Sequence, residues 1–125
     1  MKNIEILIIT RSVVLQQGLG ALLESLPEIS SVKAIQELTK AYAWIEGHQP
    51  GIIFIDSDVI ENNPDMALGK ILTFSPRTRR VLLVDDVKKL SLMQKYVEAV
   101  LIKGAAPSAV ATIVTNLLAD KGDDL

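Results

Sequence analysis

Gly51-Ile52-Ile53-Phe54-Ile55-Asp56 is the stretch of sequence that decides the fold of this 125-residue chain. Its apolar residues are mostly β-branched and Pro50 precedes them, a pattern typical of a central parallel strand that is buried on both faces. In an open α/β sheet, ligands and chemistry gather at the carboxyl ends of the strands. We therefore expect Asp56 on a rigid, solvent-reachable base, where a carboxylate can act as a metal ligand, general base or nucleophile. The alternative is an aspartate that only starts a loop or caps the next helix.

Length and composition indicate one soluble globular domain. Hydrophobic residues make up 49% of the chain and charged residues 22%, which are ordinary values for such a domain. We expect the domain over residues 1–120 and a tail, or the start of a linker, over 121–125. The net charge of −2 gives no basic surplus for direct nucleic-acid binding. The chain has no cysteine, which excludes disulfides and thiolate zinc and fits a reducing, cytoplasmic location. The apolar run at 4–9 is only one strand long, so neither a signal peptide nor a membrane span is predicted.

Apolar strand patterns alternate with amphipathic helix patterns along the whole chain. Strands are predicted over 4–9, 32–35, 51–55, 81–84 and 100–102. Helices are predicted over 14–26, 38–47, 66–74 and 90–97, and from Pro107 onward, with Ser12 as the cap of the first and Pro64 near the start of the third. This alternation predicts a flavodoxin-like, doubly wound (βα)5 sandwich, an α/β fold with a parallel five-stranded sheet in the order 2-1-3-4-5.

Polar side chains follow the predicted strands and are expected to meet at the switch point between the first and third strands. The groups that should line this crevice are Thr10, Arg11, Ser12, Asp56, Ser57, Asp58, Asp85, Asp86 and Lys103.

With these motifs the chain resembles a bacterial response-regulator receiver domain, especially receivers that precede a LuxR-type helix-turn-helix. Four stretches carry the resemblance: the first strand and helix up to Glu24, Asp56, Ser75-Pro76, and Leu101-Ile102-Lys103-Gly104-Ala105-Ala106-Pro107. The resemblance implies that Asp56 is the phosphoacceptor and that Lys103 belongs to the phosphoryl pocket. It also implies a histidine kinase or other signalling protein as partner, and a C-terminal DNA-binding domain outside this chain.

The chain departs from the family at the positions that would hold Mg²⁺ and relay a signal. Thr10 and Arg11 replace the two acidic residues after the first strand, Asp85 replaces the hydroxyl after the fourth, and Val100 replaces the aromatic switch residue on the fifth. Mg²⁺ is usually held by carboxylates and phosphate, so we expect no metal and no cofactor here. Arg11 is instead predicted to pair with Asp56 or Asp85. Asp85, which pairs with Arg11 or Lys103, should repel an incoming phosphoryl group.

Three functions are open from the residues. The favoured one is a degenerate receiver, not an enzyme, that works by protein–protein interaction in one constitutive conformation. Its homodimer or partner face would bear Lys95, Tyr96, Val110 and Val114 or their neighbours. The second is a working phosphoacceptor in which Asp56 attacks a phosphodonor while Arg11 and Lys103 stabilise the charge. The third is a flavodoxin-like cofactor binder, which is disfavoured because no Gly- or Ser/Thr-rich phosphate loop follows the first strand.

Overall fold

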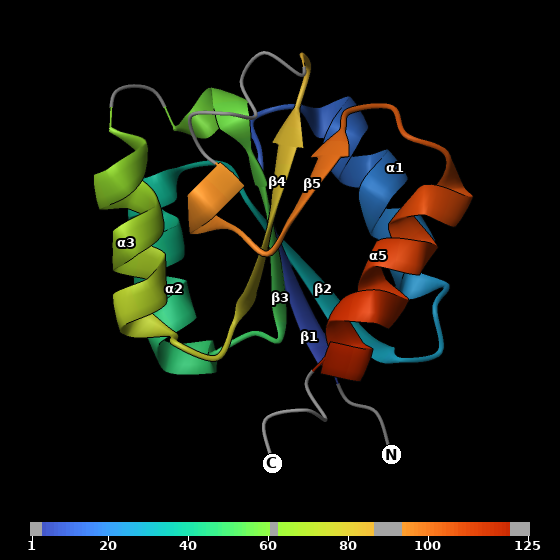
Figure 1. Cartoon of the computed structure of the whole chain (residues 1–125), viewed down its shortest axis with the longest axis horizontal. Coiled ribbons are helices and arrows are strands. Elements are labelled where there is room, and N and C mark those ends of the chain that lie inside the picture. The colour runs from blue at the N-terminus through green and yellow to red at the C-terminus, as the bar shows by residue number, and fades with distance from the viewer. Residues whose placement is uncertain (1–3, 61–62, 87–93, 121–125) are drawn as a thin grey trace.

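A parallel five-stranded sheet with helices on both faces forms the domain (Figure 1). The computed structural model describes residues 4–60, 63–86 and 94–120. The strand order is β2-β1-β3-β4-β5, which confirms the predicted topology. The strands are β1 Ile4–Ile9, β2 Ile29–Ile35, β3 Ile52–Asp56, β4 Arg79–Val84 and β5 Ala99–Ile102. The helices are α1 Val13–Glu24, α2 Leu38–His48, α3 Pro64–Phe74 and α5 Pro107–Asp120.

Two of the helices, α1 and α3, begin where the sequence supplies a capping side chain. The Ser12 side chain accepts a hydrogen bond from the Leu15 amide at 3.1 Å, which fixes the start of α1 as predicted. Asn63 does the same for the Met66 amide at 3.1 Å, and Pro64 occupies the first turn of α3. In both helices the cap satisfies an amide that has no partner within the helix.

Most element ends lie within two residues of the prediction, and two elements differ more. β2 starts at Ile29, three residues earlier than predicted, because it pairs with β1 from Ile4 onward with one shift of register. The predicted fourth helix falls partly on residues 87–93, which lie outside the described residues, Leu90 and Met93 among them. What the structure describes there is a short 3-10 helix at Gln94–Tyr96.

Each face of the sheet has its own apolar core. α2 and α3 cover one face, with Ala41, Ile45, Leu68 and Ile71 packed on the strands. α1 and α5 cover the other face (Figure 1), and they contribute Leu19, Leu23, Val110, Val114 and Leu117. All five residues of β3 are buried, as its apolar sequence predicts, so Asp56 sits on an immobile base.

None of the described helices is long and apolar enough to cross a membrane.

Candidate functional site

Asp56 ends β3 at the carboxyl edge of the sheet, and its carboxylate is buried and held by several donors. Its side chain is only 4% exposed. Oδ2 accepts a hydrogen bond from the Thr10 hydroxyl at 2.7 Å, and Oδ1 accepts one from the Asp58 amide at 2.9 Å. The second bond caps the short 3-10 helix at Ser57–Val59. Asp56 therefore lies in the crevice, as predicted, and it also caps the segment that follows, while its chemical role stays a prediction.

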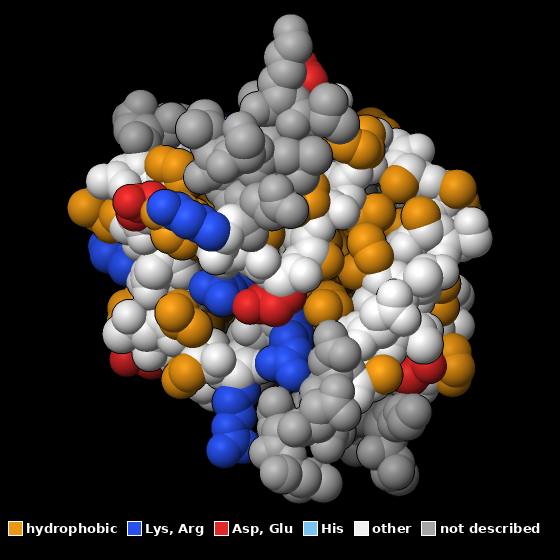
Figure 2. All heavy atoms as spheres, in the orientation of Figure 1, with side chains coloured by type: hydrophobic (Ala, Val, Ile, Leu, Met, Phe, Trp, Pro, Cys, Tyr) orange, Lys and Arg blue, Asp and Glu red, His pale blue; other side chains and the backbone are white. Residues whose placement is uncertain are grey.

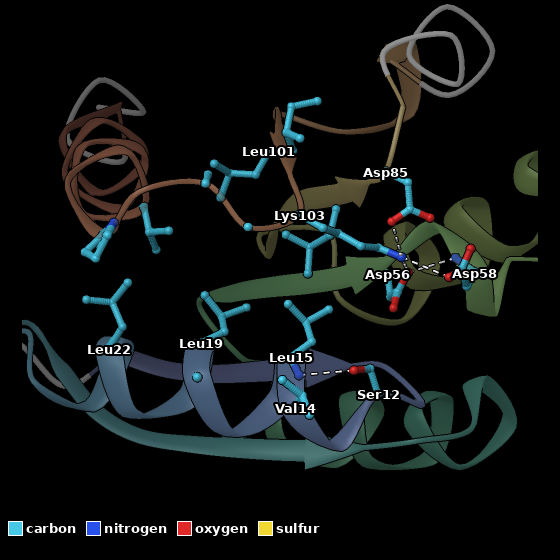
Figure 3. A pocket seen from close by; sticks show the side chains of 17 residues that line it. Ser12, Val14, Leu15, Leu19, Leu22, Asp56, Asp58, Asp85, Leu101 and Lys103 are labelled. Carbon is cyan, nitrogen blue, oxygen red and sulfur yellow. Dashed lines mark hydrogen bonds and ion pairs between the residues drawn. The ribbon is translucent and has the colours of Figure 1, made fainter.

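Lys103 supplies the positive charge for this carboxylate. It follows β5 directly, and its amide donates to the Val84 carbonyl at 2.8 Å, which fixes its backbone beside the end of β4. Gly104 comes next with φ of 84°, a backbone conformation that glycine adopts without steric cost and that turns the chain away from the sheet. The Lys103 side chain points back to the crevice, as Figure 3 shows.

The Lys103 ammonium joins three carboxylates. Its Nζ lies 2.5 Å from Asp56 Oδ1, 2.9 Å from Asp58 Oδ2 and 3.4 Å from Asp85 Oδ1 (Figure 3). The ammonium hydrogen-bonds the carboxylates of Asp56 and Asp58 and forms a longer ion pair with Asp85. Burial alone would lower the pKa of Lys103, but the hydrogen bonds and charges of Asp56 and Asp58 outweigh it and raise that pKa above its ordinary value. Lys103 is therefore fully charged at neutral pH.

The two residues after β1 serve different partners. The Thr10 hydroxyl, buried beside Asp56, also accepts a hydrogen bond from the Ser12 amide at 3.1 Å. Arg11 is exposed, and its Nη1 donates to the Asp58 carbonyl at 3.3 Å. This corrects the predicted pairing of Arg11 with Asp56 or Asp85. Among the described residues the cation that pairs with both carboxylates is Lys103, which enters between them from the end of β5.

The donor set does not fit the Mg²⁺ that the family resemblance implies. No three His, Cys, Asp or Glu side chains in the described part of the chain are placed to hold one metal ion. The three carboxylates that do converge have an ammonium between them, and the carbonyl of Asp58 accepts from a guanidinium. Hard cations need such oxygens free to coordinate them. We derive no step through a metal at this site.

The structure separates the residues predicted for the interaction face. Val110 and Val114 are 4% and 1% exposed and belong to the core between α5 and the sheet, so they are not surface residues. The periodicity of α5 marks its apolar stripe but not whether that stripe faces the sheet or a partner. Lys95 is exposed and Tyr96 is half-buried. Val100 is half-buried in β5 and packs on the core of the α2/α3 face.

Sequence reasoning missed two features of this edge of the sheet. The first is the role of Asp58 as a direct partner of Lys103, which the short 3-10 helix after Asp56 creates by turning the chain back. The second is a groove of about 630 Å³ between α1 and α5 that ends at the carboxylate cluster. Its lining includes Leu15, Gly18, Leu19, Leu22, Leu83, Leu101, Pro107 and Val110.

Comparison with family models finds no match, and comparison with curated proteins finds none either. Solved structures do match. A LuxR-family two-component response regulator from Aurantimonas sp. SI85-9A1 aligns with a TM-score of 0.80 at 16% identity, over 95% of this chain and 87% of that one. The chain has the fold of a response-regulator receiver domain. A two-component response regulator from Clostridium difficile has a TM-score of 0.80 at 19% identity, over 92% of this chain and 95% of that one. The receiver domain of an HD domain-containing protein from Pseudomonas fluorescens Pf-5 has a TM-score of 0.81 at 19% identity, over 99% and 93%.

Proposed function

We propose that this chain is a receiver-type regulatory module of two-component signal transduction that works by protein–protein interaction, without Mg²⁺-dependent phosphorylation. The observation that carries the proposal is the state of Asp56, whose side chain is 4% exposed and whose carboxylate shares the ammonium of Lys103 with two further carboxylates, those of Asp58 and Asp85. The receiver fold supports the signalling role, and the site chemistry supports its atypical form.

The electrostatics of the cluster disfavour phosphoryl transfer. A phosphoryl group brings roughly two negative charges to its acceptor. Asp58 and Asp85 already share the ammonium of Lys103 with Asp56, so an added phosphate would face two further carboxylates. At about 4 Å and an effective dielectric near 20, each unit-charge repulsion costs about 4 kcal/mol. Without a divalent ion to offset it, this repulsion raises the barrier for attack by Asp56.

A second function is favoured by one specific contact. Asp56 Oδ1 lies 2.5 Å from Lys103 Nζ, so a cation stands ready beside the attacking oxygen. In this alternative an Asp56 oxygen attacks the phosphorus of a phosphohistidine or a small acyl phosphate. The bond from phosphorus to the donor breaks, the donor leaves with the bonding pair, and Lys103 and Arg11 stabilise the charge.

Intact-mass measurement after incubation with acetyl phosphate separates the two functions. The full chain is treated with and without Mg²⁺, and Asp56→Asn is treated in parallel as the control that lacks the acceptor. We expect no phosphoryl mass increase in either protein, with or without metal. A mass increase in the wild type that the Asp56→Asn variant lacks would overturn the proposal and establish the phosphoacceptor function.

For the interacting surface we propose the face formed by β5 and the start of α5. Figure 2 shows hydrophobic side chains gathered over this region. Ile102 is 41% exposed there, and a shallow hollow beside it is lined by Val100, Ala105, Ala109 and Ile113 among others. Lys95 and Tyr96 flank the start of β5. We propose a second copy of this chain, a histidine kinase or another cytoplasmic signalling protein as the partner, and a C-terminal DNA-binding domain as the output.

A further inference from the structure

The groove between α1 and α5 is built like a small-molecule site. Its volume of about 630 Å³ lies within the roughly 300–1,000 Å³ that is typical of ligand pockets. Figure 3 shows Leu15, Leu19 and Leu22 pointing from α1 into the groove, with Leu101 and Lys103 across it. Such pockets combine apolar walls with a few polar groups that fix the orientation of a ligand. Here the polar groups gather at one end.

The shape of the groove follows from one position on α1. Gly18 lies in the middle of the helix and lines the groove, and a Cβ built there would meet nothing within 4 Å. Glycine lowers the stability of a helix interior relative to other residues, so α1 does not need a glycine at this position in order to form. The neighbouring turn residues Leu15, Leu19 and Leu22 form the walls. The groove therefore presents apolar surface along α1 up to the carboxylates.

The charge at the polar end selects the kind of ligand. The charged side chains among the described residues that line the groove are Asp56, Asp58, Asp85 and Lys103, so three carboxylates and one ammonium leave a formal charge of −2. Lys103 already pairs with all three carboxylates, so an anionic head would have to compete with them for the ammonium. Asp85 is 56% exposed and, at 3.4 Å, is the carboxylate farthest from the ammonium. A cation placed beside Asp85 gains attraction from this exposed carboxylate while Lys103 keeps its shorter contacts with Asp56 and Asp58.

We propose that this groove binds a small cationic amphiphile, with its apolar body between α1 and α5 and its amine head at Asp85 and the adjoining carboxylates. The argument for a cation is charge complementarity with the cluster, and the argument for a small molecule is the size of the groove. This site adjoins the β5/α5 face proposed for protein partners and shares Ile102 and Ala105 with it, and the proposal does not require that Asp56 accept phosphate.

A matched set of three probes tests the proposal on the full chain. Phenylbutylamine, phenylbutanol and phenylbutyrate share one apolar body and differ in the charge of the head. Each is titrated at neutral pH while amide shifts are followed by NMR, with Leu19 and Leu101 as reporters in the groove and Ala41 and Ile45 as references on the opposite face. We expect saturable shifts at the groove reporters alone, with the amine binding about tenfold more tightly than the carboxylate.

Three variants sharpen the test. Gly18→Leu should fill the groove and abolish binding of the amine, whereas Gly69→Leu, at an equally open glycine inside α3, should leave it unchanged. Asp85→Asn should weaken binding of the amine about threefold and leave the alcohol unaffected, because it removes one exposed charge. An amine that binds no better than the carboxylate, or that binds Gly18→Leu as well as the wild type, would overturn the proposal. Groove shifts that follow protein concentration without any probe would assign the groove to a second copy instead and overturn it too.

Discussion

Replacing Lys103 with methionine removes the one cation shared by three carboxylates and keeps most of the side-chain volume. The cost comes mainly from Asp56, because its side chain is 4% exposed whereas those of Asp58 and Asp85 are 55% and 56% exposed. Removing one partner of a buried pair typically costs about 3–5 kcal/mol. Asp56 keeps its hydrogen bonds from Thr10 and the Asp58 amide, so the low end of that range applies. The two exposed pairs add at most about 1 kcal/mol together.

We therefore expect Lys103→Met to lower the free energy of unfolding by about 3 kcal/mol at pH 7. Urea denaturation measures this, and with a slope of about 1.5 kcal/mol per molar the midpoint should fall by about 2 M. Lys40→Met is the matched control, because Lys40 forms an exposed pair with Glu37 in which the side chains are 76% and 58% exposed. Lys40→Met should lower the free energy of unfolding by no more than about 0.5 kcal/mol.

A double-mutant cycle with Asp56→Asn shows whether the buried charge is the cause. Asp56→Asn alone should cost less than Lys103→Met, because it leaves Lys103 with two carboxylates and strands no buried charge. The double variant should recover about 2 kcal/mol relative to additivity. If Lys103→Met costs less than about 1 kcal/mol, or if the two substitutions are additive, the electrostatic account of this cluster is wrong.

Three further predictions follow from the same geometry. The pKa of Lys103 is raised in the folded state, so its ion pairs contribute their full free energy to stability below the unfolded-state pKa of about 10.4. That contribution is lost only as pH rises through the folded-state pKa. The difference in the free energy of unfolding between wild type and Lys103→Met should therefore stay constant from about pH 7 to 9. If that difference in the free energy of unfolding shrinks between about pH 7 and 9, Lys103 does not have the raised pKa that this prediction uses. Titration with millimolar Mg²⁺ should leave the amide shifts of Thr10, Arg11 and Asp56 unchanged, and a saturable change there would show that a metal site exists. If the chain self-associates through β5 and α5, Ile102→Asp should shift it to monomer in sedimentation while Val14→Asp, an exposed change on α1, should not; equal effects would exclude that face.

The strands and their order were predictable because the apolar runs are short, continuous and separated by capped helices. Asp56 shows why the site was only partly predictable. Its position follows from the end of a buried strand, so the sequence indicates that it lies at the switch point. Its partners depend on side-chain reach across strands, and the sequence could not say that Lys103 rather than Arg11 would enter between the carboxylates.

The position of the apolar stripe of α5 illustrates a second limit. Val110 and Val114 have helical spacing, which predicts an apolar stripe but not what covers it. The structure buries that stripe on the sheet, so the exposed surface of this region is carried by Ile102 and its neighbours instead. The groove between α1 and α5 was invisible for a related reason, because a gap between two helices depends on the distance between them, which no local pattern encodes.

The sequence differences from receiver domains, which the chain resembles, explain why the carboxylates at this edge of the sheet gather around Lys103. Relative to the family, the chain lacks carboxylates after β1, where Thr10 and Arg11 stand, and has one after β4, where Asp85 stands. β4 pairs with β5 but β1 does not, so a carboxylate after β4 lies nearer to Lys103, which follows β5, than a carboxylate after β1 would. Three carboxylates then surround an ammonium fixed at the end of β5, and the hydroxyl of Thr10 and the guanidinium of Arg11 take up oxygens of Asp56 and Asp58 that a cation would need. A cluster in which one ammonium pairs with three carboxylates holds the buried Asp56 in place without metal or phosphate, which is the state that a constitutive interaction module requires.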